Sequence, residues 1–277
     1  MNKITFYTLI LLFISFSSYG QSKIKKAEES LKKETNSSKT SKSKFDDSKN
    51  NTSENDLLTE VIGGFFIQIF TYTAYGIAIE SPFEMENKSS NAFITKYPYL
   101  NSNKGNYSYD WDEGSEIFKT TISNRYIFEN SRINGNHLNL NMRFFKRVGL
   151  EIDYLQLWEN NPNFGKDNLA IYKAMVKYYR VRTERFDLWW GLGASYIDGE
   201  VNELGFTYGL GAELFFAKPL SLEVNFNQTL VNSETVNQFN GLLNYHLKQY
   251  KFSGGYAHLK IGSQKFSTMS LGLGVSF

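Results

Sequence analysis

Strict alternation of apolar and polar residues runs through the second half of the chain. In residues 204–216 the even positions are apolar or aromatic, and the odd positions between them are mostly glycine, threonine and glutamate. The same period of two recurs in residues 138–144, 220–226 and 269–277. Successive side chains of a β-strand point to opposite faces of its sheet, so this period predicts strands with one apolar and one polar face.

Applied to the rest of the chain, the pattern predicts ten strands between residues 116 and 277. Each is long enough to cross a bilayer as a tilted strand, for which about 9–11 residues suffice. None of the four prolines falls in the interior of a predicted strand, and Pro219 stands at the first position of one, as ladder hydrogen bonding requires. Because the number is even, both ends of the sheet are expected on one side, the periplasmic side for an exported chain. The predicted strands are 116–129, 136–146, 147–157, 168–180, 186–197, 202–216, 219–230, 236–248, 250–261 and 265–277.

The region before the strands begins with an export signal. Lys3 precedes an apolar run, and small residues stand before Gln21, so residues 1–20 are predicted to be a cleavable signal peptide. An uncleaved anchor is the alternative. Residues 21–56 are rich in lysine, serine and acidic residues, which predicts a disordered, solvated spacer. A role of its lysines at anionic surfaces is the other interpretation.

Residues 57–115 are predicted to form a pre-barrel helix and a connection. Residues 57–79 are largely apolar and contain only one charge, Glu60. We interpret them as a helix that lies at the membrane interface or packs against the following domain; an inner-membrane span and one or two extra strands are the alternatives. Residues 81–115 are predicted to be a loop or a short ordered connection. The predicted helix carries one polar or small stripe, formed by Glu60, Gly63, Gly64, Gln68 and Thr71.

Composition favours a membrane barrel over a soluble barrel or sandwich, which would alternate too. The 277-residue chain has a net charge of +2, no cysteine and 16% aromatic residues. The charge gives no reason to expect nucleic-acid binding, and the lack of cysteine excludes disulfides and thiolate sites. The polar face is rich in small residues, as a tight lumen requires, and aromatic residues crowd the strand ends, where interfacial girdles lie. A bilayer requires a sheet without edges, so we predict a closed barrel.

Residues 116–277 resemble the small outer-membrane β-barrel proteins of Gram-negative, Bacteroidota-type bacteria. The resemblance is carried by the final strand with its terminal Phe277, the Gly-Leu-Gly-Ala sequences at 191–194 and 209–212, and residues 218–223. It implies an all-β fold: an antiparallel up-and-down transmembrane β-barrel of about ten strands, preceded by a short helical segment. It also implies that the barrel-assembly machinery reads the final strand. It implies no particular activity, because such barrels have adhesive, structural, transport and enzymatic roles.

The polar face also carries charges, which we interpret as a salt-bridge network that neutralises a narrow lumen. Asp187, Glu213 and Glu223 are predicted to form one row toward the periplasmic end. A cation site or proton-linked site at this row is the functional alternative. Charges in a confined space are retained when they are paired, which favours the structural interpretation. The other charged or titratable residues assigned to the lumen are Arg143, Glu151, Asp153, Lys173, Lys177, His246 and Lys251.

Enzymatic chemistry has one candidate pair in the sequence. His258 and Ser267 are expected opposite each other near the outer rim, where a lipid-modifying hydrolase would need them. No acid is expected beside them to orient the histidine, so no catalytic residue is assigned. No His/Asp/Glu cluster has metal-ligand spacing, and the Gly-X-Gly pairs lie on strands with no helix after them. We therefore predict no metal and no cofactor.

The sequence thus predicts an integral outer-membrane barrel with a non-enzymatic structural or interaction role. Its expected partners are outer-membrane lipid, the barrel-assembly machinery and, through the spacer, the cell wall or a periplasmic protein. A narrow channel for a small solute or ion is the first alternative, and a lipid-modifying enzyme is the second. Short external loops argue against capture of a large ligand; they are predicted near 130–135, 158–167, 198–201, 231–235 and 262–264.

Overall fold

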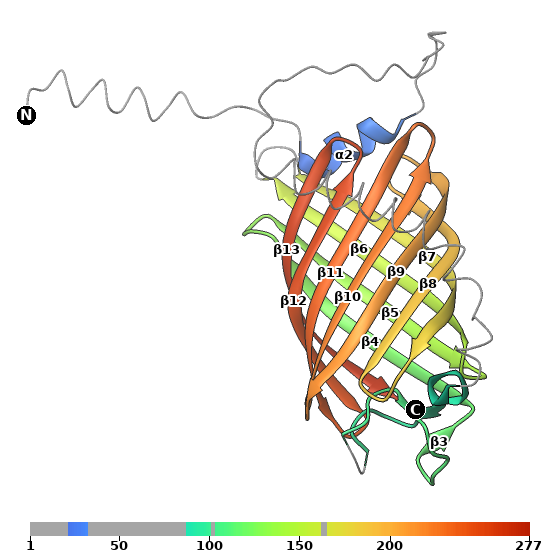
Figure 1. Cartoon of the computed structure of the whole chain (residues 1–277). Coiled ribbons are helices and arrows are strands. Elements are labelled where there is room, and N and C mark those ends of the chain that lie inside the picture. The colour runs from blue at the N-terminus through green and yellow to red at the C-terminus, as the bar shows by residue number, and fades with distance from the viewer. Residues whose placement is uncertain (1–21, 33–86, 101–102, 162–164) are drawn as a thin grey trace, which may run out of the picture.

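The structure, a computed structural model, describes residues 22–32, 87–100, 103–161 and 165–277. Its body is a closed barrel of ten antiparallel strands, each paired with the next along the chain (Figure 1). The predicted all-β, up-and-down barrel is therefore confirmed. The strands are β4 (Phe118–Phe128), β5 (Ile133–Phe144), β6 (Val148–Asn161), β7 (Gly165–Arg182), β8 (Phe186–Asp198), β9 (Glu203–Ala217), β10 (Leu220–Val231), β11 (Glu234–Leu247), β12 (Tyr250–Ile261) and β13 (Gln264–Ser276).

Closure of the barrel depends on the pairing of β13 with β4. Met269 pairs with Phe128 and Ser276 pairs with Thr121, so the backbone groups of both edge strands are satisfied. Observed and predicted strand ends agree to within a few residues. The largest difference is β6, which is predicted to end at residue 157 and extends to Asn161. Its last residues are polar but still pair with β7, because apolar alternation is required only within the membrane band.

The outer face of the barrel wall is apolar around the barrel. Large hydrophobic side chains point outward and are exposed on every strand of the barrel, for example Val176 on β7, Phe206 on β9 and Leu271 on β13. Tyrosine and tryptophan side chains also meet across neighbouring strands, as in the ring contacts of Tyr154 with Tyr172 and of Tyr178 with Trp190. An exposed apolar surface of this extent suits the hydrocarbon of a bilayer and not water.

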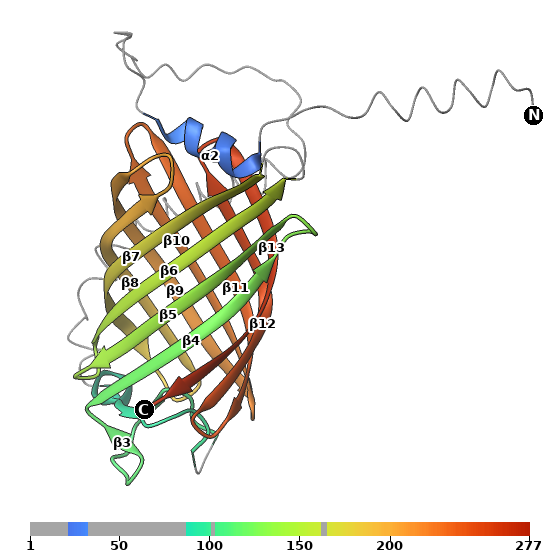
Figure 2. The same cartoon turned by 180° about the vertical axis from the view of Figure 1, so that it is seen from behind.

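The two ends of the barrel are covered by segments that precede it in the chain (Figures 1 and 2). Helix α2 (Lys23–Leu31) lies across one end, which we call the helix mouth. The opposite end, the plug mouth, holds both ends of the strand series. It is covered by the short helix η1 (Lys88–Asn91) and by a small sheet in the order β2 (Tyr107–Ser108), β1 (Phe93–Thr95), β3 (Ser115–Glu116).

Helix α2 corrects part of the sequence prediction. It lies inside the range 21–56, which was predicted to be a disordered periplasmic spacer, and it sits at the mouth opposite the strand ends. Ile24, Ala27 and Leu31 recur on one face of the helix and are fully buried in the barrel mouth, which offsets the entropy of ordering. Ser22 caps the helix by accepting a hydrogen bond from the Lys25 N–H at 3.1 Å.

Other predictions for the first part of the chain fall outside the described residues. These are the signal peptide at 1–20, the remaining spacer at 33–56 and the helix at 57–79. The connection predicted at 81–115 is described from Asn87 onward, apart from residues 101–102, and is more ordered than expected because it forms the small sheet at the plug mouth. Within the described ranges, no helix is both long and apolar enough to cross a membrane.

Candidate functional site

The interior of the barrel is the candidate site, and its first layer, beneath α2, is apolar. Side chains from the upper ends of many strands meet the buried face of the helix there. They form one cluster with it: Ile24, Ala27, Leu31, Ile127, Ile133, Leu155, Leu157, Leu169, Ile171, Ile197, Val201, Val231, Val236, Leu259, Ile261 and Phe266. This layer separates the polar lumen from the space outside the helix mouth.

Polar contacts around the rim of the helix mouth attach α2 to the barrel. The Lys23 ammonium lies 2.6 Å from the Glu129 carboxylate, and the Ile24 N–H donates to Glu159 at 3.0 Å. At the other end of the helix, the Asn232 amide donates to the Leu31 carbonyl at 3.0 Å. The buried Glu28 side chain accepts a hydrogen bond from the Glu200 N–H at 2.9 Å. Contacts on several sides fix the helix across the mouth.

The middle layer is a compact salt-bridge cluster centred on Lys173. Its ammonium lies 2.9 Å from Glu151 and 2.6 Å from Asp153, and Lys177 forms a second ion pair with Glu151. All four side chains are buried. Taking charges out of water is costly, so such groups persist only where they are paired and hydrogen-bonded. These four residues form a salt-bridge network of the kind that the sequence predicts for the lumen.

Histidine 137 extends this cluster to Arg125. The Arg125 guanidinium contacts His137 Nδ1; because arginine has only donors, Nδ1 must accept that hydrogen bond. The other ring nitrogen, Nε2, therefore carries the proton and donates to Asp153 at 2.7 Å. His137 is thus a neutral bridge between a cation and an anion.

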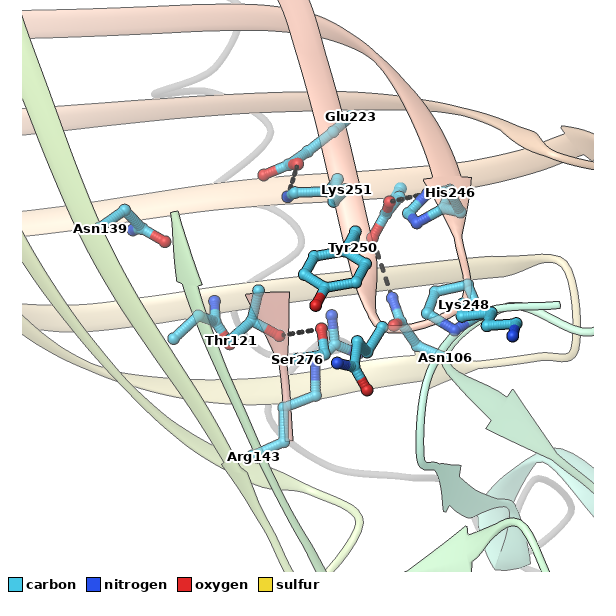
Figure 3. Close-up of a pocket in the computed structure, with 14 residues that line it drawn as sticks. Asn106, Thr121, Asn139, Arg143, Glu223, His246, Lys248, Tyr250, Lys251 and Ser276 are labelled. Carbon is cyan, nitrogen blue, oxygen red and sulfur yellow. Dashed lines mark hydrogen bonds and ion pairs between the residues drawn. The ribbon is translucent and has the colours of Figure 1, made fainter. Parts of the chain in front are cut away.

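The third layer contains the predicted acidic row. Asp187, Glu213 and Glu223 occupy neighbouring register positions on β8, β9 and β10. Asp187 pairs with Arg143 at 2.9 Å, and Glu223 pairs with Lys251 at 3.2 Å; Figure 3 shows Lys251 pointing toward Glu223. Cations from other strands therefore neutralise Asp187 and Glu223, whereas Glu213 accepts hydrogen bonds from neighbouring polar side chains.

The small sheet at the plug mouth contributes to this layer through Asn106. The Asn106 amide nitrogen donates to Asp187 and to Glu213, each at 2.8 Å, and its oxygen accepts from Lys119 at 3.0 Å. One side chain thus joins two carboxylates and an ammonium, and in Figure 3 it lies among the lumen side chains. The segment is held in the mouth by this contact and by the Tyr99 hydroxyl, which donates to the Leu220 carbonyl at 2.5 Å.

His246 lies on the same level but forms no strong ion pair. Ser221 donates to Glu213 at 2.7 Å, so its oxygen is free to accept from His246 Nε2 at 2.8 Å. The Glu213 carboxylate is 3.7 Å from the same nitrogen. His246 also packs against the rings of Tyr99 and Phe215, so it acts as a packing and hydrogen-bonding residue of the lumen.

Little space remains between these side chains. One polar cavity, lined by Asn106, Glu213 and Lys251 among others, has a volume of about 50 Å³. A second, lined by Arg125, Asp153 and Asn240 among others, has a volume of about 30 Å³. Such volumes hold a few water molecules and exclude a sugar or an amino acid. A ten-stranded barrel is close to the size that its own side chains fill.

All ten residues assigned to the lumen from the sequence point inside the barrel. They separate into two groups, the Lys173 cluster and the predicted acidic row, which Arg143 joins through its ion pair with Asp187. Lys119 and Arg125 were missed, although they follow the same alternation on β4 and the period of two predicts their inward direction. Asn106 lies in a segment with no regular period, so no comparable signal was available for it.

The candidate catalytic pair lies where the sequence placed it. His258 and Ser267 are register partners on β12 and β13, and His258 Nδ1 is 3.1 Å from Ser267 Oγ on the outer face. Glu129 lies nearby, but it accepts from the Ser267 N–H at 3.1 Å and pairs with Lys23. The buried His258 Nε2 has no hydrogen-bond partner among the described residues. The described part of the chain also holds no group of three or more residues able to bind a metal ion.

No family model and no curated protein sequence matches this chain. Several solved structures match this chain at low similarity. A KdgM porin is 14% identical, with a TM-score of 0.37 over 57% of this chain and 99% of its own. The outer membrane protein Ail of Yersinia pestis is 14% identical, with a TM-score of 0.33 over 57% of this chain and 99% of its own. An outer membrane channel from Pseudomonas putida F1 is 10% identical, with a TM-score of 0.38 over 61% of this chain and 100% of its own.

Proposed function

We propose that this protein is an integral outer-membrane barrel with a structural or interaction role, and that it neither conducts solutes nor acts as an enzyme. The observation that carries the proposal is the occupied interior. An apolar layer under α2, two layers of paired charges and the segment around Asn106 follow one another from mouth to mouth. A pore would require a continuous polar path wide enough for its solute.

Two features support the membrane location. The closed wall exposes apolar side chains all around, and the sequence begins with the features of an export signal. In this proposal the plug mouth faces the periplasm, the helix mouth faces the outside, and β13 with its terminal Phe277 is the strand that the assembly machinery reads.

Conductance of the folded protein in planar bilayers tests the proposal. We expect no channel steps from the wild-type protein, and the same result for Glu223→Gln, which alters the charge of the acidic row. Ion-selective steps from the wild-type protein that change in Glu223→Gln would establish a narrow channel instead. Insertion is verified on the same sample by the different gel migration of unboiled and boiled protein.

A lipid-modifying activity is the second candidate, because the 3.1 Å contact of His258 with Ser267 places a nucleophile beside a base on the lipid-facing wall. Its test is the Ser267→Ala variant. A change in the lipid profile of the outer leaflet, compared with cells that express the wild type, would support the enzyme. An unchanged profile would support the non-enzymatic role.

The interaction role is assigned to the spacer outside α2. Its many lysines and serines suit contact with a polymer or a protein and not burial. Deletion of residues 33–55 removes no residue of α2 or of the barrel, and we expect it to reduce recovery of the partner in pull-downs from cross-linked cells. Unchanged recovery would remove the support for this assignment.

A further inference from the structure

Arg125 is a buried cation that contacts no carboxylate among the described residues. It points inward from β4 and is 5% exposed. Its guanidinium contacts three neutral groups, which are His137 Nδ1, the Ser270 hydroxyl at 3.4 Å and the Asn240 amide oxygen at 3.5 Å. These contacts use three of the five N–H donors of the guanidinium. Arginine stays protonated in proteins, so Arg125 brings a permanent positive charge into the barrel.

The carboxylates nearest to Arg125 do not compensate this charge, because each of them has a lysine of its own. The three pairs are Glu151 with Lys177, Asp153 with Lys173 at 2.6 Å, and Glu223 with Lys251 at 3.2 Å. His137 adds no charge, since its ring accepts from Arg125 at one nitrogen and donates to Asp153 at the other. Four cations thus face three carboxylates, and a buried charge without a counter-ion is costly.

A polar cavity beside Arg125 has the donors that a small anion requires. Asn141 and Asn225 line it together with Arg125. The Asn225 amide oxygen accepts from Asn240 at 2.8 Å, and the Asn141 amide oxygen accepts from the Tyr179 hydroxyl at 3.1 Å. Neither of the two amide nitrogens has a hydrogen-bond partner in the part of the chain that the structure describes. Two amide groups and the remaining guanidinium donors therefore border one cavity.

The size of this cavity selects a monoatomic anion. Its volume is about 30 Å³, which holds about two water-sized particles. A chloride ion is only slightly larger than a water molecule, whereas sulfate, a sugar phosphate or a carboxylic acid of metabolism is much larger. The carboxylates that line the cavity are held by their lysines, so the donors of Arg125, Asn141 and Asn225 remain for the ion.

The cavity is reached from the plug mouth. It shares Asn139 and Lys251, among other residues, with the neighbouring cavity of about 50 Å³, whose lining Figure 3 shows. That larger cavity extends to Lys248 and Gln249 in the turn between β11 and β12. On the other side, the apolar cluster beneath α2 closes the lumen. An ion can therefore enter and leave at one mouth only, as expected for a bound ion and not for a transported one.

We propose that the barrel binds one chloride ion in this cavity, held by the Arg125 guanidinium and the amide groups of Asn141 and Asn225. The ion supplies the negative charge that the surrounding side chains lack. Because it binds the folded barrel and not the unfolded chain, it couples the stability of the barrel to the chloride concentration. This inference goes beyond the proposed structural role and does not depend on it, since it rests on the charges and donors of the lumen alone.

Urea unfolding of the protein folded in lipid vesicles tests the proposal, with sodium chloride exchanged for sodium gluconate at constant ionic strength. Gluconate is too large for the cavity. A ligand that binds only the folded state lowers the equilibrium constant of unfolding in a saturable way. We expect chloride to lower this constant at least about fivefold in the wild type. Lys166→Met removes an exposed cation of β7 and should leave the chloride dependence unchanged.

Two substitutions in the cavity should abolish the chloride dependence. Arg125→Gln removes the charge that the ion compensates. Asn225→Asp keeps an oxygen that accepts from Asn240 and places a fixed carboxylate beside Arg125, so this variant should fold equally well in chloride and in gluconate. It decides the question if Arg125→Gln does not give a folded barrel. A chloride dependence that persists in Asn225→Asp, that is lost in Lys166→Met, or that is lacking in the wild type would overturn the proposal.

Crystals grown in sodium bromide locate the ion directly, because bromide replaces chloride and gives an anomalous diffraction signal. We expect one anomalous peak within hydrogen-bond distance of the Arg125 guanidinium in the wild type, and no peak there in Asn225→Asp. Bromide found only on the protein surface, with no peak beside Arg125, would overturn the proposal.

Discussion

At the scale of single residues, the interior is organised by the need to pair buried charges. Lys173 lies between Glu151 and Asp153, and Asn106 joins two carboxylates to Lys119. Removing one member of such a group leaves its partners as unpaired charges in a low-dielectric interior. The free-energy cost of these unpaired charges exceeds what the same pair would contribute in water. Stability therefore depends strongly on individual lumen residues.

Lys173→Met is expected to lower the free energy of unfolding by about 3–5 kcal/mol, because Glu151 and Asp153 lose their shared cation. The measurement is urea unfolding of the protein folded in lipid vesicles. Lys166→Met, on the same strand but exposed, is the matched control and should change the value by less than about 0.5 kcal/mol. Equal effects of the two substitutions would show that the lumen charges are not energetically coupled.

Glu28 gives the docking of α2 a pH dependence. Burial raises the pKa of the Glu28 carboxyl above its usual value, and the hydrogen bond from the Glu200 N–H opposes this rise only in part. A group with a raised pKa in the docked state contributes stability at low pH and loses it as the pH rises through that pKa. The docked helix is therefore expected to loosen as the pH rises through the raised pKa of the Glu28 carboxyl.

Hydrogen exchange of the amides of residues 23–31, corrected for the intrinsic effect of pH, measures this loosening. In the wild-type protein, protection should fall as the pH rises. In Glu28→Gln, whose amide oxygen still accepts from Glu200, protection should stay constant with pH. The same pH dependence in both proteins would exclude Glu28 as its source.

At the scale of elements, α2 is bound mainly by three apolar side chains and acts as a separate unit on the barrel rim. Its burial explains why a polar segment is ordered, and it also explains why composition averaged over residues 21–56 failed to predict the helix. Three apolar positions among many lysines and serines do not change that average. The helical spacing of these three positions indicates an ordered helix only when the apolar barrel mouth in which they are buried is known.

Leu31→Asp is expected to release α2 without unfolding the barrel, because a carboxylate would replace a fully buried side chain. Limited trypsin digestion should then cleave at the lysines of α2 at least tenfold faster, while the unboiled protein keeps its gel migration. Lys26→Ala, on the exposed face of α2, should not change the cleavage rate at the remaining lysines. Loss of the folded gel band in Leu31→Asp would instead make α2 part of the barrel core.

At the scale of the whole molecule, the sequence predicts the barrel well and its two covered mouths poorly. The alternation that defines the strands also assigns Asp187, Glu213 and Glu223 to one row, because register follows once the hairpins are placed. Asn106 and α2 depend on contacts between segments far apart in the chain, which no local period encodes. The occupied lumen, on which the proposed function rests, is therefore a property of the folded chain and could not be read from the strands alone.

Everything proposed for this chain depends on its forming a closed barrel embedded in the outer membrane. The most direct test compares gel migration of unboiled and boiled protein from a washed outer-membrane fraction. We expect the protein in that fraction, and we expect the unboiled sample to migrate differently until it is heated, because the closed sheet resists detergent. Soluble periplasmic protein with identical migration before and after boiling would contradict the membrane barrel and would require a soluble β-domain instead.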